Sequence, residues 1–108
     1  MAKYLLIESR DPFEAAGAHD SIDLAVDLVR AGHTVTLFLV QNGVLPARPC
    51  RFSAALSTAV DAGVEVLADD FSLRERGIAA RKLADGIQAA PLSVVIDQMV
   101  DGRRTIWH

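Results

Sequence analysis

The sequence predicts one α/β domain of three layers, α/β/α, in which helices cover both faces of a mainly parallel sheet of about five strands. First, short apolar runs of strand length recur along the 108 residues, and such runs are typical of strands buried on both faces. Second, helix-prone segments separate these runs with short connections, which favours parallel strands joined by crossover helices. Third, the length fits one domain, 1–108, without a linker or repeat.

The first strand and helix follow from the N-terminal third of the chain. KYLLIES, residues 3–9, is continuously apolar in its middle and predicts the first strand. A loop at 10–18 with a proline and a glycine comes next. The helix after it opens at His19, with Asp20 or Ser21 as N-cap. Apolar residues at helical spacing continue it to Gly32, which suits the C′ position.

The remaining elements follow from β-branched runs for strands, alanine-rich runs for helices, and glycine or proline at boundaries. They are a strand at 33–40, a turn at 42–43, irregular chain at 44–50, a helix at 53–62, strands at 64–68 and 85–89, a short helix at 73–78, a helical turn at 79–83, a helix at 91–102 and a last strand at 103–108. We expect the apolar residues of the last two elements to be core, with a subunit interface as the alternative. These residues are Val94, Val95, Met99, Ile106 and Trp107.

Composition excludes several classes of function. The formal net charge of -3 argues against nucleic acid as a partner, because phosphate binding needs a basic face. The N-terminal apolar run is too short for a signal peptide, and no later run has the length of a membrane span. A single cysteine cannot form an internal disulfide. We therefore expect a cytoplasmic protein with no membrane partner and no cofactor.

Several pieces of the chain together resemble one family. These pieces are IESRDPFE, the AGH that precedes the second strand, NGV, GVEVLADDFSLRERGI and the final TIW. Over nearly its whole length the sequence resembles the DsrE/DsrF-like superfamily, which includes the sulfur-relay proteins of the Tus and Dsr systems. The resemblance implies a DsrE/F-like fold and a role in sulfur relay or sulfur metabolism. It also implies trimers or hexamers of like or related chains, with a sulfur-carrier protein as a further partner.

One position departs from the pattern of this family. In its sulfurtransferring members a cysteine lies at the mouth of the third strand, before a segment similar to SLRxRGI, and carries sulfur as a persulfide. The matching position here is Asp69, or Ala68 if the register slips by one. A carboxylate cannot hold a persulfide. The resemblance therefore implies a divergent or non-catalytic member that acts through oligomeric assembly and partner binding.

Asp69 and Asp70 are the candidate pocket residues, because ligands bind at the carboxyl ends of parallel strands. With Asn42, Gly43 and Arg74 they would give a small-molecule binding module an acidic pocket. Cation binding and general-base chemistry are further roles, although two adjacent aspartates are a poor metal site, and we expect no metal. The alternative, which we favour, is that one of them caps the following helix.

Cys50 is the only residue able to form a persulfide. It lies in RPCRF between Arg48 and Arg51, whose guanidinium groups favour the nucleophilic thiolate. If the protein is active, it would be a sulfurtransferase or sulfur carrier that uses Cys50; the alternative is an inert buried thiol.

Two sets of polar residues are assigned to the surface. The basic set could bind an anion, but its mixed charges favour a solvated helix face. The histidines lack a visible partner and are expected to be surface or cap residues. These residues are Arg74, Arg76, Arg81 and Lys82, and His19, His33 and His108.

Overall fold

The computed structural model describes residues 1–108 and contains one sheet of five parallel strands in the order β4-β3-β2-β1-β5. The strands are β1 (Lys3–Glu8), β2 (Thr34–Leu39), β3 (Glu65–Asp69), β4 (Gln88–Ala90) and β5 (Arg104–Trp107). The helices are α1 (His19–Arg30), α2 (Ser53–Ala62), α3 (Asp70–Glu75) and α4 (Ser93–Val100), with 3₁₀ helices at Ala16–Ala18, Gln41–Ala47 and Ala80–Lys82. The predicted fold class, a three-layer α/β domain with a parallel sheet, is confirmed.

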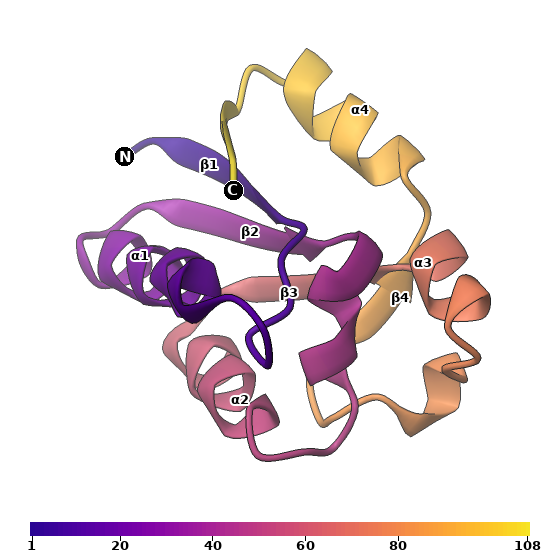
Figure 1. The fold of residues 1–108 in the computed structure, drawn as a ribbon. Coiled ribbons are helices and arrows are strands. Elements are labelled where there is room, and N and C mark those ends of the chain that lie inside the picture. The colour runs from indigo at the N-terminus through magenta and orange to yellow at the C-terminus, as the bar shows by residue number, and fades with distance from the viewer.

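Helices lie on both faces of the sheet, as Figure 1 shows for α1 and α2 on one side and α4 on the other. Alternate residues of a strand point to opposite faces, so Leu6 packs with α1 and α2 while its neighbours Leu5 and Ile7 pack with Val95 of α4. The face under α1 and α2 holds a core of 17 buried residues, and the face under α4 holds only 7. The two faces are therefore covered unequally.

The α4 face also contains a partly buried chain of polar side chains near the start of β2. Arg103 Nη1 donates to Thr36 Oγ1 at 3.0 Å, and Thr36 Oγ1 donates to Glu65 Oε1 at 2.8 Å. Hydrogen bonds of this kind satisfy polar groups that apolar packing would leave unpaired. Apolar packing on this face is thus confined to its middle and to the carboxyl ends of the strands.

Most element boundaries agree with the sequence prediction, and the differences have local causes. Helix α2 has its predicted bounds and ends, as predicted, before Gly63, which takes a left-handed conformation with a φ of 110°. Helix α3 begins at Asp70, before the expected start, because Asp69 caps it. Strand β4 is later and shorter than expected: Gly86, with a φ of 85°, keeps the chain in a turn before Gln88.

Two local predictions were wrong. The two prolines were expected to keep 44–50 irregular, but the 3₁₀ helix Gln41–Ala47 includes Pro46. The fixed φ of proline is compatible with this helix. Neither Asp20 nor Ser21 caps α1, because the preceding 3₁₀ turn makes Ala18 the N-cap. The Ser21 hydroxyl donates to Glu8 instead.

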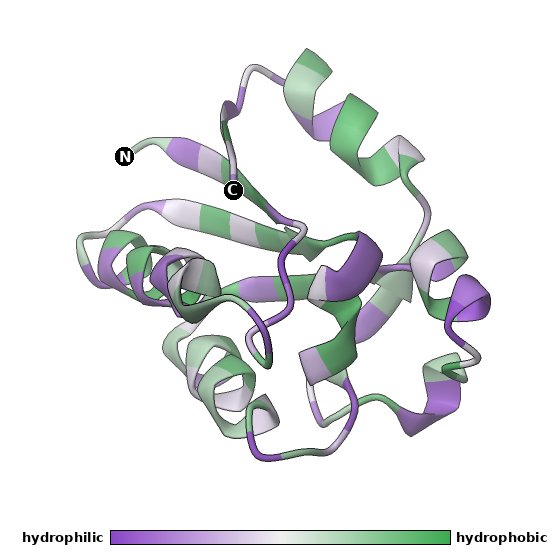
Figure 2. Ribbon diagram, viewed as in Figure 1, coloured by the Kyte–Doolittle hydropathy of each residue, from purple (hydrophilic) through white to green (hydrophobic).

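The expected core position of the late apolar residues was also wrong for most of them. Val95 is buried and Val94 is half-buried, but Met99, Ile106 and Trp107 are exposed, Trp107 by 65%. The cause is the short α4 and the edge position of β5, which leave these side chains only partly covered by the rest of the chain. Figure 2 shows hydrophobic residues over most of α4, which stands at the outside of the fold. No helix has both the length and the hydropathy to cross a membrane.

Candidate functional site at the carboxyl ends of the strands

A cavity of about 430 Å³ lies where β2, β3 and β5 end. It is lined by Val40, Gln41, Asp69, Phe71, Ser72, Glu75, Arg76, Leu92 and Trp107. In open parallel sheets ligands bind at this edge, outside the carboxyl ends of the strands. The volume lies within the range of small-molecule sites. We call this cavity the strand-edge pocket.

Asp69 connects β3 to α3 and lines this pocket while being only 6% exposed. Its Oδ2 accepts two hydrogen bonds, from the Ser72 backbone N–H at 3.0 Å and from Ser72 Oγ at 2.7 Å. Asp69 is therefore the N-cap of α3, so the capping interpretation is confirmed. Its other oxygen, Oδ1, is buried and accepts no hydrogen bond from the protein.

Ser72 also contacts the loop that follows β2. Its Oγ accepts a hydrogen bond from the Gln41 backbone N–H at 2.8 Å. Gln41 has a φ of 52° and is the only non-glycine residue in the left-handed region. This conformation costs about 1–2 kcal/mol for such a residue, and residues of this kind concentrate at functional sites. The loop after β2 is thus held against α3 in a strained conformation.

Arg76 closes one side of the pocket. Its Nε donates to Asn42 Oδ1 at 3.0 Å and its Nη1 to the Ser72 carbonyl at 3.1 Å. Asn42 therefore acts by holding Arg76, and it does not itself line the pocket. Gly43 is buried beneath the end of β1, where a Cβ would lie 2.3 Å from the Glu8 carbonyl oxygen.

Asp70 and Arg74, the other predicted pocket residues, pair with each other at 4.0 Å on the outer side of α3. Neither lines the strand-edge pocket. Such an exposed pair contributes little to stability. The basic side chains of this segment do not form one patch: Arg74 is separate, whereas Arg76 and Lys82 border a hollow of about 270 Å³ with Arg48.

Cys50 lies in the loop before α2 and is half-exposed. Its Sγ lies 3.8 Å from the Pro46 carbonyl, and its backbone N–H donates to Ser53 Oγ at 3.2 Å. The residue lines none of the four hollows of the surface. Its role as a sulfur carrier stays a prediction.

Sequence reasoning missed one cluster at the end of β1. Glu8 is 3% exposed, and its Oε1 lies 2.8 Å from both Ser21 Oγ and His108 Nδ1. His108 was expected to be a surface or cap residue, but it pairs with a buried carboxylate. The signal was available, because a glutamate in a strand buried on both faces needs a partner. The partner is about 100 residues away, which no local pattern reveals.

The other two histidines have simple contacts. His33 Nδ1 accepts from the Ala2 backbone N–H at 3.0 Å, and His19 stacks near Phe52 at 5.2 Å between ring centroids. No group of three or more histidine, cysteine, aspartate or glutamate side chains is placed to hold a metal ion.

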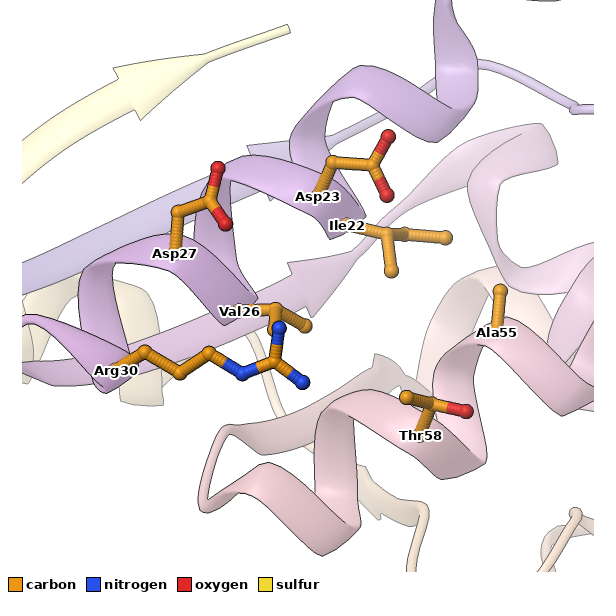
Figure 3. A pocket seen from close by; sticks show the side chains of 7 residues that line it. All are labelled: Ile22, Asp23, Val26, Asp27, Arg30, Ala55 and Thr58. Carbon is orange, nitrogen blue, oxygen red and sulfur yellow. The ribbon is translucent and has the colours of Figure 1, made fainter.

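A second hollow of about 440 Å³ lies between α1 and α2 (Figure 3). Ile22, Val26 and Ala55 form its floor, and Arg30 reaches across it, while Asp23 and Asp27 point away from α2. No buried polar side chain without a partner lies in it. This hollow is a seam between two packed helices, and the strand-edge pocket is the better candidate site.

Comparison with known proteins supports the fold. No family model and no curated protein matches the chain. Among solved structures, the ychN protein from E. coli matches with a TM-score of 0.91 at 19% identity over 100% of both chains. MTH1491 from Methanobacterium thermoautotrophicum, a protein of unknown function, matches with 0.79 at 15% identity, also over 100% of both. BT1422 from Bacteroides thetaiotaomicron matches with 0.78 at 13% identity over 98% of this chain and 94% of that one.

The sheet order and the site define a parallel α/β protein with a ligand-sized cavity at its strand ends. Within this class the chain shares the fold of the ychN protein and of MTH1491. At these identities the likeness concerns the fold alone.

Proposed function

We propose that this chain is a non-catalytic DsrE-like protein of sulfur relay or sulfur metabolism, which acts through oligomeric assembly and partner binding. One observation carries the proposal. Where the resemblance places the sulfur-bearing cysteine, the chain has Asp69, whose carboxylate is buried and caps α3. No thiol lines the strand-edge pocket. The proposed work of the protein is therefore recognition, with its pocket at a subunit boundary.

The surface of α4 and β5 supports assembly. Five of the ten exposed large apolar side chains lie there on the α4 side of the sheet, and we call them the apolar patch: Leu92, Ile96, Met99, Val100 and Trp107. Ile106 lies on the opposite face, where it lines a hollow with Leu24. Val100 is 84% exposed, and α4 contains a single charged residue, Asp97. Contiguous apolar surface of this kind marks interaction sites in folded proteins. Because the resemblance implies oligomers of like chains, we assign the patch to a second copy.

Molar mass in solution tests this assignment. We expect the wild type to elute as an oligomer in size-exclusion chromatography with light scattering, and Val100→Glu to shift it toward the monomer. Leu24→Glu is the matched control, because Leu24 is an exposed leucine on α1, away from the patch. A monomeric wild type, or equal dissociation by both variants, would contradict the assignment.

A second candidate is sulfur carriage by Cys50, favoured by the partial exposure of this residue and by its place in the sequence between Arg48 and Arg51. In this reaction the Cys50 thiolate attacks the outer sulfur of glutathione persulfide, forms Cys50–S–S⁻ and releases glutathione, with no net oxidation. Intact-mass spectrometry would show a gain of one sulfur atom in the wild type and none in Cys50→Ser. No gain in either protein would remove this candidate.

A third candidate is small-molecule binding at the strand-edge pocket. The unpartnered Oδ1 of Asp69 favours this candidate.

A further inference from the structure

We propose that the strand-edge pocket binds a small organic cation, an ammonium or amidinium group attached to an apolar body, through Asp69. This inference deepens the small-molecule candidate above and rests on it, but it does not require the assembly.

The free oxygen of Asp69 is the first observation. Nearly all buried polar atoms in folded proteins have a hydrogen-bond partner, so each exception needs an explanation. Two other buried atoms lack partners, Gln98 Oε1 and Arg103 Nε, but neither residue lines a hollow. Asp69 alone combines an unpartnered buried atom with a place in a cavity. A carboxylate oxygen is only an acceptor, so the missing partner is an N–H or O–H donor.

Charge selects a cationic donor. The pocket contains two acidic side chains, Asp69 and Glu75, and one basic side chain, Arg76. Arg76 is engaged by Asn42 and by the Ser72 carbonyl, and Glu75 forms no ion pair. The acceptors of Arg76 are neutral oxygens, so none of the three charges is in an ion pair, and the formal charge of the lining, two acidic side chains against one basic, is -1. An anionic ligand would be repelled by Asp69, and the N–H and O–H of Ser72 cannot compensate because they are already used by Asp69 Oδ2. Only the remaining N–H groups of Arg76 could donate to it.

The apolar side chains that line the pocket indicate that the rest of the ligand is apolar. Phe71, Leu92 and Trp107 line the pocket, yet each is more than half exposed. Aromatic faces attract cations, and large flat side chains cover apolar bodies. Since Oδ1 is buried, a ligand reaches it only if side chains at the rim change rotamer. Exposed side chains change rotamer within nanoseconds, so Phe71 and Trp107 are free to adjust to a ligand.

Trp107 is the only tryptophan of the chain and lines this pocket, so its fluorescence reports the surroundings of one side chain. The probes are 2-phenylethylammonium, the neutral 2-phenylethanol and the anionic 3-phenylpropanoate, which share one ring and differ in charge. We expect saturable binding of the cation, at least about tenfold weaker binding of the neutral probe, and no saturation with the anion, because hydrogen bonds to charged groups are the stronger ones.

Asp69→Asn is the informative variant, because asparagine caps helices as well as aspartate does but removes the charge. We expect it to weaken cation binding at least about tenfold. Asp70→Asn is the matched control, since the neighbouring carboxylate lies outside the pocket, and it should bind like the wild type. Shifts of the Gln41 amide and the Trp107 indole N–H in NMR spectra of the wild type provide a readout that requires no variant.

The titration is repeated on Val100→Glu, so that burial of the rim by a second copy cannot hide the pocket. Molar mass reports the assembly, and fluorescence of Val100→Glu reports the ligand without a change of assembly, so the failure of one is distinguishable from the failure of the other. Equal affinity for cation and anion, unchanged affinity in Asp69→Asn, or no saturable response in either the wild type or Val100→Glu would overturn the proposal.

Discussion

Gly43→Ala tests how tightly the chain is packed behind the candidate site. Gly43 lies in the 3₁₀ helix after β2 and is buried against the end of β1. Its φ is outside the left-handed region, so alanine meets no conformational strain there. The cost of the substitution is therefore steric: an added Cβ would lie 2.3 Å from the Glu8 carbonyl oxygen and 3.0 Å from its carbonyl carbon.

The geometry sets the magnitude. A carbon and a carbonyl oxygen approach to about 3.3 Å, so the two segments have to separate by roughly 1 Å. Glu8 resists this movement, because its carbonyl accepts the Val40 N–H at 3.0 Å and its side chain holds Ser21 and His108. Overpacking of this kind costs about 1–3 kcal/mol, and the helical preference of alanine over glycine returns less than about 1 kcal/mol. We expect a net loss near 2 kcal/mol.

Urea unfolding followed by circular dichroism measures this loss. With a slope of about 1–3 kcal/mol per molar urea, the midpoint should fall by about 1 M. Gly17→Ala is the matched control: it also lies in a 3₁₀ helix, and the nearest atom to its added Cβ is 3.6 Å away. A loss below about 0.5 kcal/mol, or equal losses in the two variants, would refute the steric argument.

Three further predictions concern the carboxylates at the strand ends. Asp69→Ala should destabilise the fold by about 1 kcal/mol more than Asp69→Asn, because only asparagine preserves the cap of α3; equal urea midpoints would count against this. Asp69→Cys, made in a Cys50→Ser background, should gain one sulfur atom from glutathione persulfide by intact mass, since the resemblance places the sulfur-bearing thiol there; an unchanged mass would remove that correspondence. His108→Ala should cost about 1–3 kcal/mol by leaving Glu8 with fewer partners, and an unchanged urea midpoint would mean that the contact is not stabilising.

Local patterns predicted the fold and one residue of the site. The strand at 3–9, the helix at 53–62 and the cap at Asp69 depend on neighbours in sequence, and all three lie at or near their expected places. The pairing of Glu8 with His108 could not be predicted, because it depends on which strands become neighbours. The same holds for Trp107, which joins the pocket only because β5 runs beside β1.

The order of the strands also accounts for the apolar patch. The chain passes from β1 to β4 in one direction across the sheet, and then returns past all of these strands to place β5 beside β1. The return is made by α4 alone, on the face opposite α1 and α2 (Figure 1). A helix of eight residues is about 12 Å long and about 10 Å wide, whereas five strands span roughly 19 Å. One such helix cannot cover the face.

The incomplete covering of this face of the sheet by α4 underlies both proposals. The core under α4 stays small, and side chains that would be buried beneath a second helix remain exposed on α4 and β5. The strand-edge pocket opens at the end of this incomplete layer, between Leu92 and Trp107 on one side and α3 on the other. A second copy would complete the layer, and a ligand on Asp69 would fill the opening that remains. Cation binding should therefore respond to assembly: if the second copy helps to enclose the ligand, the cation should bind more weakly to Val100→Glu than to the oligomeric wild type.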